Sequence, residues 1–371
     1  MGRLLGGLAL AGQLLSVPLA TAAESIHAAF AQGALAGQVG LYGISGKARD
    51  EERQGFISGR ASLAYQTAPW QHLSLGLGAW GTTRLHETRD GDYRETVASD
   101  ALIHLAYLHF AGGDRGELTA GRHQVEQEWL TDHIVGVSAR LIPLDNLELS
   151  FGWAQRQAVV DLDEVSEGFA KMNEDNGLYF GAAHYSPLAW LTLMPYYYHA
   201  ADLYRAPGMK LTGAWGVGQH LEAATMIQYV RSNTPAGQED GDFWWLEQTF
   251  AYQDFGFGGG YMRAHPRAGS NIAEFGDQTP FEYGDNIFAA DAQTWYLAWE
   301  YGRDALSLSA LYGHTRYAAG TERPRTKELN LIAGYGWNQH LELELIYAAV
   351  RNSSVSVADF NSLSMALTYS F

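Results

Sequence analysis

Thirteen histidines and 41 aspartate and glutamate residues are the side chains of this sequence that could do chemistry. A histidine acts as a metal ligand or a general base only when a second ligand or a partner group lies at a fixed spacing from it. No His-x-His pair occurs, no Gly-x-Ser-x-Gly segment presents a nucleophile, and cysteine is absent. Because these arrangements are missing, we expect no enzyme, no catalytic site, no bound metal and no cofactor.

The acidic residues gather in three polar segments between more apolar stretches. They are Asp161, Asp163, Glu164 and Glu167 in the first, Glu239, Asp240 and Asp242 in the second, and Glu274, Asp277, Glu282, Asp285 and Asp291 in the third. Such segments are typical of a solvated surface, and their oxygen ligands also suit Ca²⁺ or Mg²⁺. Because the formal net charge is −17, a basic face for phosphate contacts is not expected, and neither is nucleic acid as a partner.

The last segment of the sequence shows how these groups are positioned. Leu363, Met365, Leu367, Tyr369 and Phe371 alternate with small or polar residues. A spacing of two places alternate side chains on opposite faces of a β-strand, so one face suits lipid or a core and the other suits water. A last strand that finishes in Phe resembles the C-terminal signal of bacterial outer-membrane β-barrels.

The first residues are typical of an export signal. Arg3 is followed by an apolar stretch from Leu4 to Leu19 and then by small residues. This order is that of a secretory signal peptide, and the stretch is too short and glycine-rich for a spanning helix, which needs ~20 apolar residues. We therefore expect residues 1–22 to be a signal peptide and residues 23–371 to form a single transmembrane domain.

The rest of the sequence is a series of hairpins. Glycine is frequent, at 42 residues, proline is rare, at 10, and 13% of residues are aromatic, as in large barrels with aromatic girdles at the membrane interfaces. A period of two predicts about eighteen strands long enough to cross a bilayer when tilted. They are 34–46, 54–66, 72–83, 99–110, 116–124, 133–142, 147–157, 176–186, 188–200, 207–217, 219–231, 243–253, 255–264, 292–301, 305–316, 326–337, 340–351 and 360–371.

The connections between these segments alternate in length. Tight turns such as Pro143-Leu144-Asp145-Asn146 alternate with longer polar connections, among them 84–98, 158–175, 232–242 and 265–291. Short periplasmic turns and longer extracellular loops are expected of an outer-membrane barrel, whereas a soluble sandwich gives no reason for the alternation. We therefore predict an all-β protein, a transmembrane antiparallel β-barrel in the bacterial outer membrane.

Charged side chains on these strands are expected to face a wet lumen, because each would cost ~2–4 kcal/mol on the lipid face at mid-membrane. The predicted pore-lining residues are Arg60, Arg140, Arg156, Glu148, Glu328, Glu342 and Glu344. The connection 265–291 is too long for a hairpin turn, so we expect it to fold partly into the mouth. The predicted constriction residues on it are Glu274, Asp277, Glu282 and Asp285.

Three segments resemble a known family of channels: Ala64-Tyr65-Gln66-Thr67-Ala68-Pro69-Trp70, Leu75-Gly76-Leu77-Gly78-Ala79-Trp80 and Leu118-Thr119-Ala120-Gly121-Arg122-His123-Gln124. With the strand count and the Tyr-x-Phe ending, they make the sequence similar to OprD-type porins of the Gram-negative outer membrane. The resemblance implies a monomer or homotrimer of 18-stranded barrels, with inward-folded loops and charged lumen residues that select small solutes. The sequence departs from the family pattern in its acidity and in the short connection 125–132, where the family usually has a longer constriction loop.

The expected function is that of a porin, a water-filled channel for passive diffusion of small hydrophilic solutes or ions. The alternative is a barrel without an open channel that acts as an adhesin, a scaffold or a surface enzyme. Expected partners are outer-membrane lipid, lipopolysaccharide bridged by divalent cations to the acidic loops, and the barrel-assembly machinery through Tyr369 and Phe371. Arg60, Arg140 and Arg156 form one arc of the predicted wall, and Glu328, Glu342 and Glu344 form another. These two arcs predict an electric field across the pore, and the acidic loops favour the passage of cations.

Overall fold

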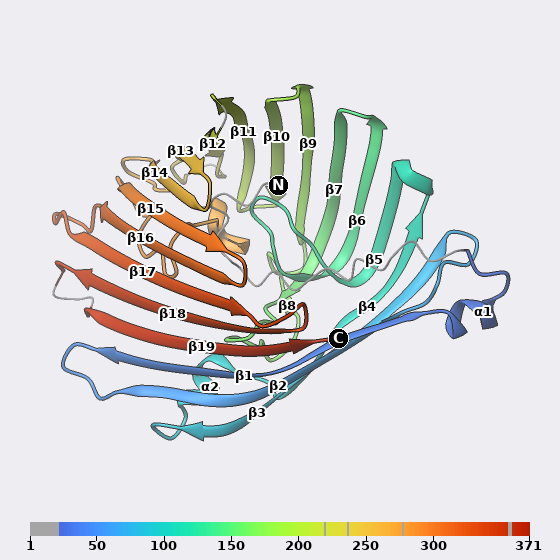
Figure 1. Ribbon diagram of the computed structural model, residues 1–371. Helices are drawn as coiled ribbons and strands as arrows, with labels where there is room; N and C mark the ends of the chain where they lie inside the picture. Colours follow the sequence, from blue (N-terminus) through green and yellow to red (C-terminus); the bar gives the residue numbers. More distant parts are fainter. Residues whose placement is uncertain (1–21, 219, 236, 277, 355–357) are drawn as a thin grey trace.

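The structure is a computed structural model that describes residues 22–218, 220–235, 237–276, 278–354 and 358–371. Nearly all of the described residues belong to strands or to the loops that join them (Figure 1). The strands are β1 (Ala34–Ala48), β2 (Gln54–Gln66), β3 (Leu73–Glu87), β4 (Ala101–Ala111), β5 (Gly116–Gln124), β6 (His133–Leu144), β7 (Leu147–Ala158), β8 (Ala170–Lys171), β9 (Leu178–Leu188), β10 (Leu191–Ala200), β11 (Tyr204–Val217), β12 (Leu221–Ser232), β13 (Gly241–Tyr252), β14 (Phe255–Ala264), β15 (Gln293–Arg303), β16 (Leu306–Arg316), β17 (Arg325–Gly336), β18 (Leu341–Asn352) and β19 (Phe360–Ser370). The helices are α1 (Ile26–Ala31) and α2 (Asp92–Thr96), with 3₁₀ turns η1 (Gly113–Arg115) and η2 (Ile272–Phe275).

The long strands close into one antiparallel barrel. β1 pairs with both β2 and β19, and the two-residue strand β8 is an addition to the edge of β7. Without β8, the ring contains eighteen strands, so the predicted fold and strand count are confirmed. Every predicted segment overlaps one strand, and 54–66, 116–124 and 255–264 have the observed bounds.

The two faces of each strand differ as the period of two predicts. Leu331 and Leu345 are exposed on the outer face, whereas Glu328 and Asn330 of β17 and Ala348 of β18 are buried on the inner face. Exposed apolar side chains of this kind surround the barrel, and a bilayer is the medium in which such exposure is favourable. Glu328 of β17 and Glu342 and Glu344 of β18 lie on the inner face, whereas Arg325, Lys327 and Arg351, near the strand ends, lie on the outer face.

The connections alternate in length around the ring. Residues 145–146, 189–190, 253–254 and 304–305 are tight turns at one end, whereas 88–100, 159–177 and 265–292 are long loops at the other. The predicted alternation is thereby confirmed. None of the helices among the described residues is long and apolar enough to cross a membrane.

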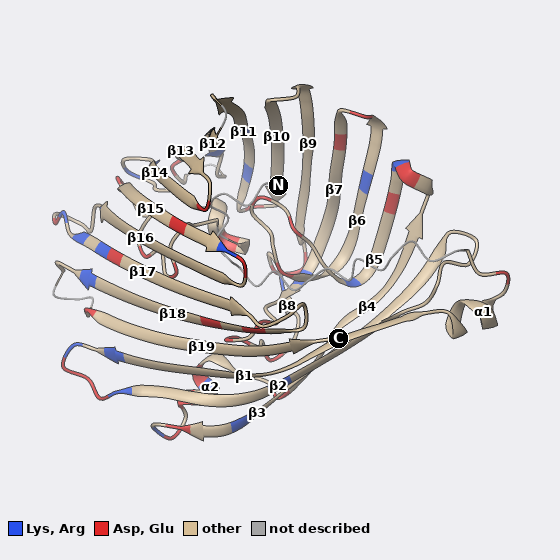
Figure 2. Cartoon of the chain, in the orientation of Figure 1, with Lys and Arg blue, Asp and Glu red and all other residues tan. Residues whose placement is uncertain are grey.

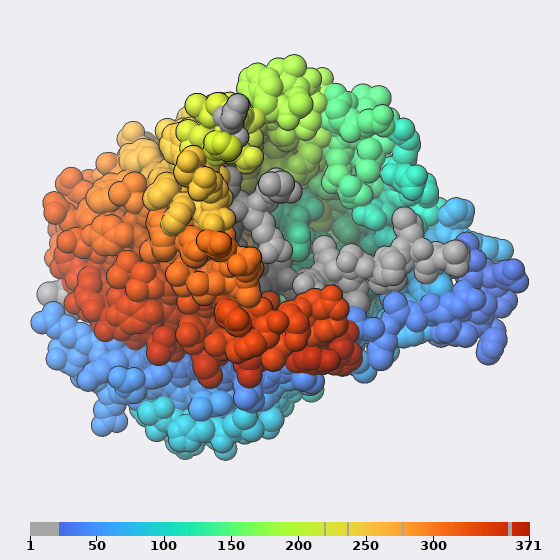
Figure 3. Space-filling view, viewed as in Figure 1, coloured from blue at the N-terminus to red at the C-terminus, as the bar shows by residue number. Residues whose placement is uncertain are grey.

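Four of the loops fold back into the barrel and build two apolar clusters inside it. The first cluster contains Trp129 of the 125–132 loop and Ile272, Phe281 and Ile287 of the 265–292 loop, packed on the inner faces of β6 to β16. The second contains Tyr93 and Val97 of the 88–100 loop and Val165 of the 159–177 loop, near β1 to β3. A hollow remains visible between the green strands β6 and β7 and the orange and red strands β15 to β18 (Figure 3).

Candidate functional site

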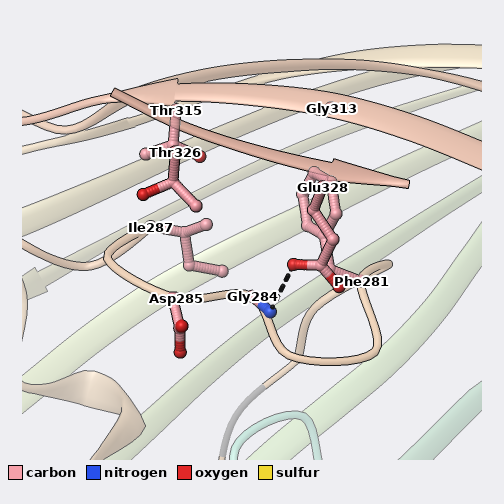
Figure 4. A pocket seen from close by; sticks show the side chains of 8 residues that line it. All are labelled: Phe281, Gly284, Asp285, Ile287, Gly313, Thr315, Thr326 and Glu328. Atoms are coloured by element: carbon pink, nitrogen blue, oxygen red, sulfur yellow. Dashed lines mark hydrogen bonds between the residues drawn. The ribbon is translucent and has the colours of Figure 1, made fainter. Parts of the chain in front are cut away.

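The 265–292 loop is held on the wall by Glu328 of β17. The Glu328 carboxylate accepts hydrogen bonds from the backbone N–H groups of Tyr283, at 2.9 Å, and Gly284, at 3.1 Å (Figure 4). Beside it, Asn330 Oδ1 accepts the N–H of Glu282 at 3.2 Å, and the Tyr283 hydroxyl donates to Ser362 Oγ at 2.8 Å. A buried carboxylate is stable only when its lone pairs are satisfied, so Glu328 and the loop backbone stabilise each other.

Phe281 fixes the same part of the loop by packing over Gly313 of β16. A Cβ atom at Gly313 would lie 2.1 Å from the Phe281 ring, so only glycine leaves room for the ring. The ring also packs edge-on against Tyr296 of β15, with centroids 5.8 Å apart. In Figure 4, Phe281 and Ile287 lie against β16 and β17, and Asp285 points away from these strands.

The other end of the loop reaches the opposite wall. Gln157 Nε2 of β7 donates to the carbonyl oxygen of Phe275, at 2.8 Å, and to Asp132 Oδ2 of the 125–132 loop, at 2.5 Å. Strands β7 and β17 lie nine strands apart in the ring of eighteen. The 265–292 loop therefore crosses the lumen from one side to the other.

The short 125–132 loop also folds inward, against β10 to β12. The backbone N–H of Trp129 donates to the Tyr198 hydroxyl at 3.1 Å, and Glu128 binds Lys210 at 2.8 Å and Gln228 Nε2 at 3.0 Å. Trp129 is only 1% exposed. The loop is shorter than the family pattern implies, and it narrows the lumen together with the 265–292 loop.

The 159–177 loop narrows the lumen from the side of β1 and β2. Arg60 Nη1 donates to the carbonyl oxygen of Asp161 at 2.7 Å, and the Arg60 guanidinium lies 4.9 Å from the centre of the Tyr42 ring. Val165 pairs with Val97 of the 88–100 loop through an isolated β-bridge. In the same loop, Tyr93 of α2 packs edge-on against Phe56 of β2. Because Arg60 is 5% exposed, it anchors this loop more than it faces a solute.

Carboxylates line the space between the 159–177 loop and the 265–292 loop. Asp163 of the 159–177 loop interacts electrostatically with Glu282 of the 265–292 loop, and Glu282 in turn with Glu344 of β18. The side chains of Asp161, Asp163, Glu164 and Glu282 are exposed to the lumen. These four loop carboxylates form no salt bridge with any residue that the structure describes, although the Arg60 guanidinium attracts Asp161 and Asp163.

Enclosure by protein raises the pKa values of these carboxyl groups. Burial within the lumen, followed by the charges of Asp163 and Asp132, raises the pKa of Asp161 to about 7. Burial and Asp163 likewise raise the pKa of Glu282 to about 7, and the same causes raise that of Glu164. Ionisation in a poorly solvated site beside like charges is unfavourable, which is why the protons are held more tightly.

The predicted wall residues have different surroundings. Arg140 Nη2 binds Glu148 at 2.6 Å near the turn between β6 and β7, so these two charges pair with each other. Figure 2 shows the blue band on β6 between red bands on β5 and β7. Arg156 Nη1 donates to the carbonyl oxygen of Phe169 at 3.3 Å and so binds the 159–177 loop. Glu342 and Glu344 of β18 form no ion pair with any described residue.

The predicted constriction residues lie on one loop but not at one place. Glu282 faces Asp163, whereas Asp285 lies beside Ile287 near β16, where burial raises its pKa. Glu274, in η2, lies at the far end of the loop near Tyr204. Asp277 lies outside the described residues. Glu282 is thus the member of the set that the structure brings to the other carboxylates.

Several residues at this site were not predicted as pore-lining. The acidic composition of their segment favours an outer surface for Asp161, Asp163 and Glu164, and no sequence pattern marks Gln157. The length of 158–175 is the signal that could have indicated an inward fold, as it did for 265–291. Among the described residues, no group of three or more His, Asp or Glu side chains is arranged to hold a metal ion.

Comparisons with known proteins agree with this geometry. The family model described as Gram-negative porin matches residues 19–354. The crystal structure of Pseudomonas aeruginosa OpdK with vanillate is similar at 15% identity and a TM-score of 0.75, over 91% of this chain and 98% of that chain. P. aeruginosa OccK9 (OpdG) is similar at 15% identity and a TM-score of 0.75, over 92% of this chain and 99% of that chain. Acinetobacter baumannii OccAB4 is similar at 16% identity and a TM-score of 0.72, over 91% of this chain and 98% of that chain. At such identities these structures show the shared fold. No curated protein matches the sequence.

Proposed function

This chain belongs to the Gram-negative porin family, and from this premise we propose that its solute path runs between Asp163 and Glu282. As a member of that family it is a barrel of the bacterial outer membrane through which small solutes diffuse. The resemblance to OprD-type porins is confirmed by the family match and by the shared barrel fold. None of the matches supports the alternative of an adhesin, a scaffold or a surface enzyme.

The electrostatics of the passage support a preference for cations and for solutes that bear an ammonium or guanidinium group. Asp161, Asp163, Glu164 and Glu282 line the passage, and none of them forms a salt bridge with a described residue. Arg60 attracts Asp161 and Asp163 but is covered by the loop that it anchors, so the four carboxylates outnumber the cations beside them. In a narrow path with low-dielectric walls, charges of one sign raise the local concentration of the opposite ion.

The vanillate found with OpdK is a carboxylate, and we propose that the present chain does not share such a substrate. An anionic solute would have to pass the pair Asp163 and Glu282, and each charge at ~7 Å in water costs it ~0.6 kcal/mol. Amines of similar size gain the same amount. An electric field between the arginine and glutamate arcs of the wall remains a proposal. The ion pair of Arg140 with Glu148 reduces the contribution of Arg140 to such a field.

Reversal potentials in a planar bilayer under a KCl gradient test this function. We expect conductance steps with a preference for K⁺. Each charge favours K⁺ and disfavours Cl⁻ by ~0.6 kcal/mol, so the double variant Asp163→Asn, Glu282→Gln should lower the K⁺ to Cl⁻ permeability ratio by about sevenfold per charge. Glu51→Gln, in the exposed loop between β1 and β2, removes a charge away from the path and is the control. Anion preference in the native protein, or an equal shift in the control, would contradict the proposed path.

We further propose that the chain is a passive channel with no catalytic activity, exported by a signal peptide at 1–22 that falls almost wholly outside the described residues. Assembly through Tyr369 and Phe371, contact of the acidic loops with lipopolysaccharide, and a monomeric or trimeric state are part of the same proposal. Electrophoresis of the native protein after cross-linking gives the number of subunits.

A further inference from the structure

Helix α1 lies on the outer surface of the barrel wall. In β2, Ile57 and Leu63 are 44% and 48% exposed on the outer face, and Tyr65 follows Leu63 by two residues on that face. The Tyr65 hydroxyl donates to the carbonyl oxygen of Phe30, the fifth residue of α1. Gly33 packs on the same ring, where a Cβ atom would lie 2.4 Å from Tyr65 Cζ. Figure 1 shows α1 outside the ring of strands.

The helix is fixed at the periplasmic end of the barrel. The backbone N–H of Ala68 donates to the carbonyl oxygen of Ala29 at 3.0 Å, and the N–H of Ala23 donates to that of Pro69 at 2.8 Å. Ala68 and Pro69 belong to the short turn between β2 and β3, which lies at the end of the short turns. Ala29 and Ala68 are both buried against each other, so α1 has one defined position.

The other face of α1 has no protein partner among the described residues. Ile26 and Phe30, four residues apart, lie on one side of the helix and are 55% and 52% exposed. Ser25 Oγ accepts the N–H of Ala28 at 3.1 Å, which caps the helix and orients this side. Leu35, 57% exposed on the outer face of β1, follows directly. The apolar surface of α1 is therefore continuous with the lipid-facing surface of the wall.

We propose that α1 is an interfacial anchor, lying in the periplasmic leaflet with Ile26 and Phe30 among the lipid acyl chains. A short helix with apolar residues on one side enters the boundary between headgroups and acyl chains to a depth of ~5–10 Å. Phe371, 50% exposed, and Trp70 lie at the same end of the barrel, where interfacial aromatic residues are expected.

The position of α1 has a consequence for the channel. It holds the first described residues against the turn between β2 and β3, where Ala23 is buried beside Ala68. It also lies next to the seam at which Gly37 of β1 and Phe371 exchange backbone hydrogen bonds of 3.0 and 2.9 Å. An anchor at this point holds the strand that closes the barrel.

Because the sequence contains no cysteine, single-cysteine variants give unambiguous spin labels. We would label Ile26→Cys and Phe30→Cys in lipid vesicles and measure collisions with oxygen, which enriches in lipid, and with a water-soluble nickel chelate. Leu63→Cys on the lipid-facing wall and Glu51→Cys in an outer loop are the references. Heat-modifiable migration on gels verifies that each variant is folded.

We expect the labels at positions 26 and 30 to collide with oxygen as at position 63 and to be several-fold less accessible to nickel than at position 51. Nickel accessibility equal to that at position 51 would place α1 in water and overturn the proposal. Low accessibility to both reagents, with label–label broadening that disappears on dilution with unlabelled protein, would show instead that a second copy of the chain covers α1, and would equally overturn it.

Discussion

The Glu328 carboxylate accepts a hydrogen bond of 2.9 Å from the backbone N–H of Tyr283. Glu328 is 4% exposed, and its second oxygen accepts the N–H of Gly284. A residue of the wall thus holds the segment of the 265–292 loop that presents Glu282 to the passage. Glu328 therefore positions the loop, and along the proposed path the charge of Glu282 is available to solutes.

Replacing Glu328 by Gln should loosen the loop. The amide has the same shape, but its NH₂ group cannot accept a hydrogen bond, so one loop N–H loses its partner at a cost of ~1–3 kcal/mol. We expect larger mean conductance and more current noise in single-channel recordings, because the loop then leaves the passage part of the time.

Glu344→Gln is the matched control, since it removes the same charge from the neighbouring strand β18, where Glu344 makes no hydrogen bond with the described residues of the loop. This variant should lower the K⁺ preference with steady current. If the two variants change noise and selectivity alike, Glu328 acts as a pore charge and not as a positioning residue.

Gly313→Val tests the same loop without changing any charge. A side chain at position 313 would overlap the Phe281 ring, and overpacking of this kind costs ~1–3 kcal/mol. We expect increased conductance and noise, as for Glu328→Gln. Gly302→Val is the comparison, because nothing lies within 4 Å of a Cβ atom at Gly302 of β15; an unchanged Gly313→Val channel would mean that Phe281 does not hold the loop.

Selectivity should depend on pH around neutrality. The pKa values of Asp161 and Glu282 are raised to about 7, so both carboxyls are largely ionised at pH 8 and largely protonated at pH 5. Protonation removes negative charge from the passage. We therefore expect the K⁺ to Cl⁻ permeability ratio, from reversal potentials, to fall as the pH is lowered from 8 to 5, by about sevenfold for each charge lost.

The double variant Asp161→Asn, Glu282→Gln provides the control for this titration. Its ratio should change less between the two pH values, because the two loop carboxyls with pKa values near 7 are gone. A variant that keeps the native pH dependence would show that Asp161 and Glu282 are not responsible for it.

The fold was predictable because a barrel wall is a local pattern. From Leu363 to Phe371, apolar residues alternate with small or polar ones, because a barrel wall has lipid on one side and water on the other. A period of two therefore predicts the strands, their faces and their order. The charged residues on the inner face follow from the same rule. Their partners do not, and the pairing of Arg140 with Glu148 depends on the neighbouring strand in register.

The site was only partly predictable, because inward-folded loops meet through contacts distant in sequence. Glu282 was expected at the constriction from loop length alone, whereas Asp161 and Asp163 were assigned to the outer surface. Nothing local indicates that Arg60 of β2 binds the backbone of Asp161, or that Gln157 binds Phe275. An acidic segment has the same composition outside a barrel and inside one.

Closure of the barrel should depend on Gly37. The Phe371 ring lies over this residue, and a Cβ atom at position 37 would lie 2.8 Å from Phe371 Cζ and 2.5 Å from the carbonyl oxygen of Ser62. Gly37→Val should therefore lower the temperature at which the folded barrel unfolds in heat-modifiability gels, in line with ~1–3 kcal/mol of overpacking. Gly216→Val, where nothing lies within 4 Å, should leave it unchanged. Adding Phe371→Ala to Gly37→Val should restore part of the loss if the ring is the obstacle, and restoration of nothing would assign the strain to the Ser62 carbonyl.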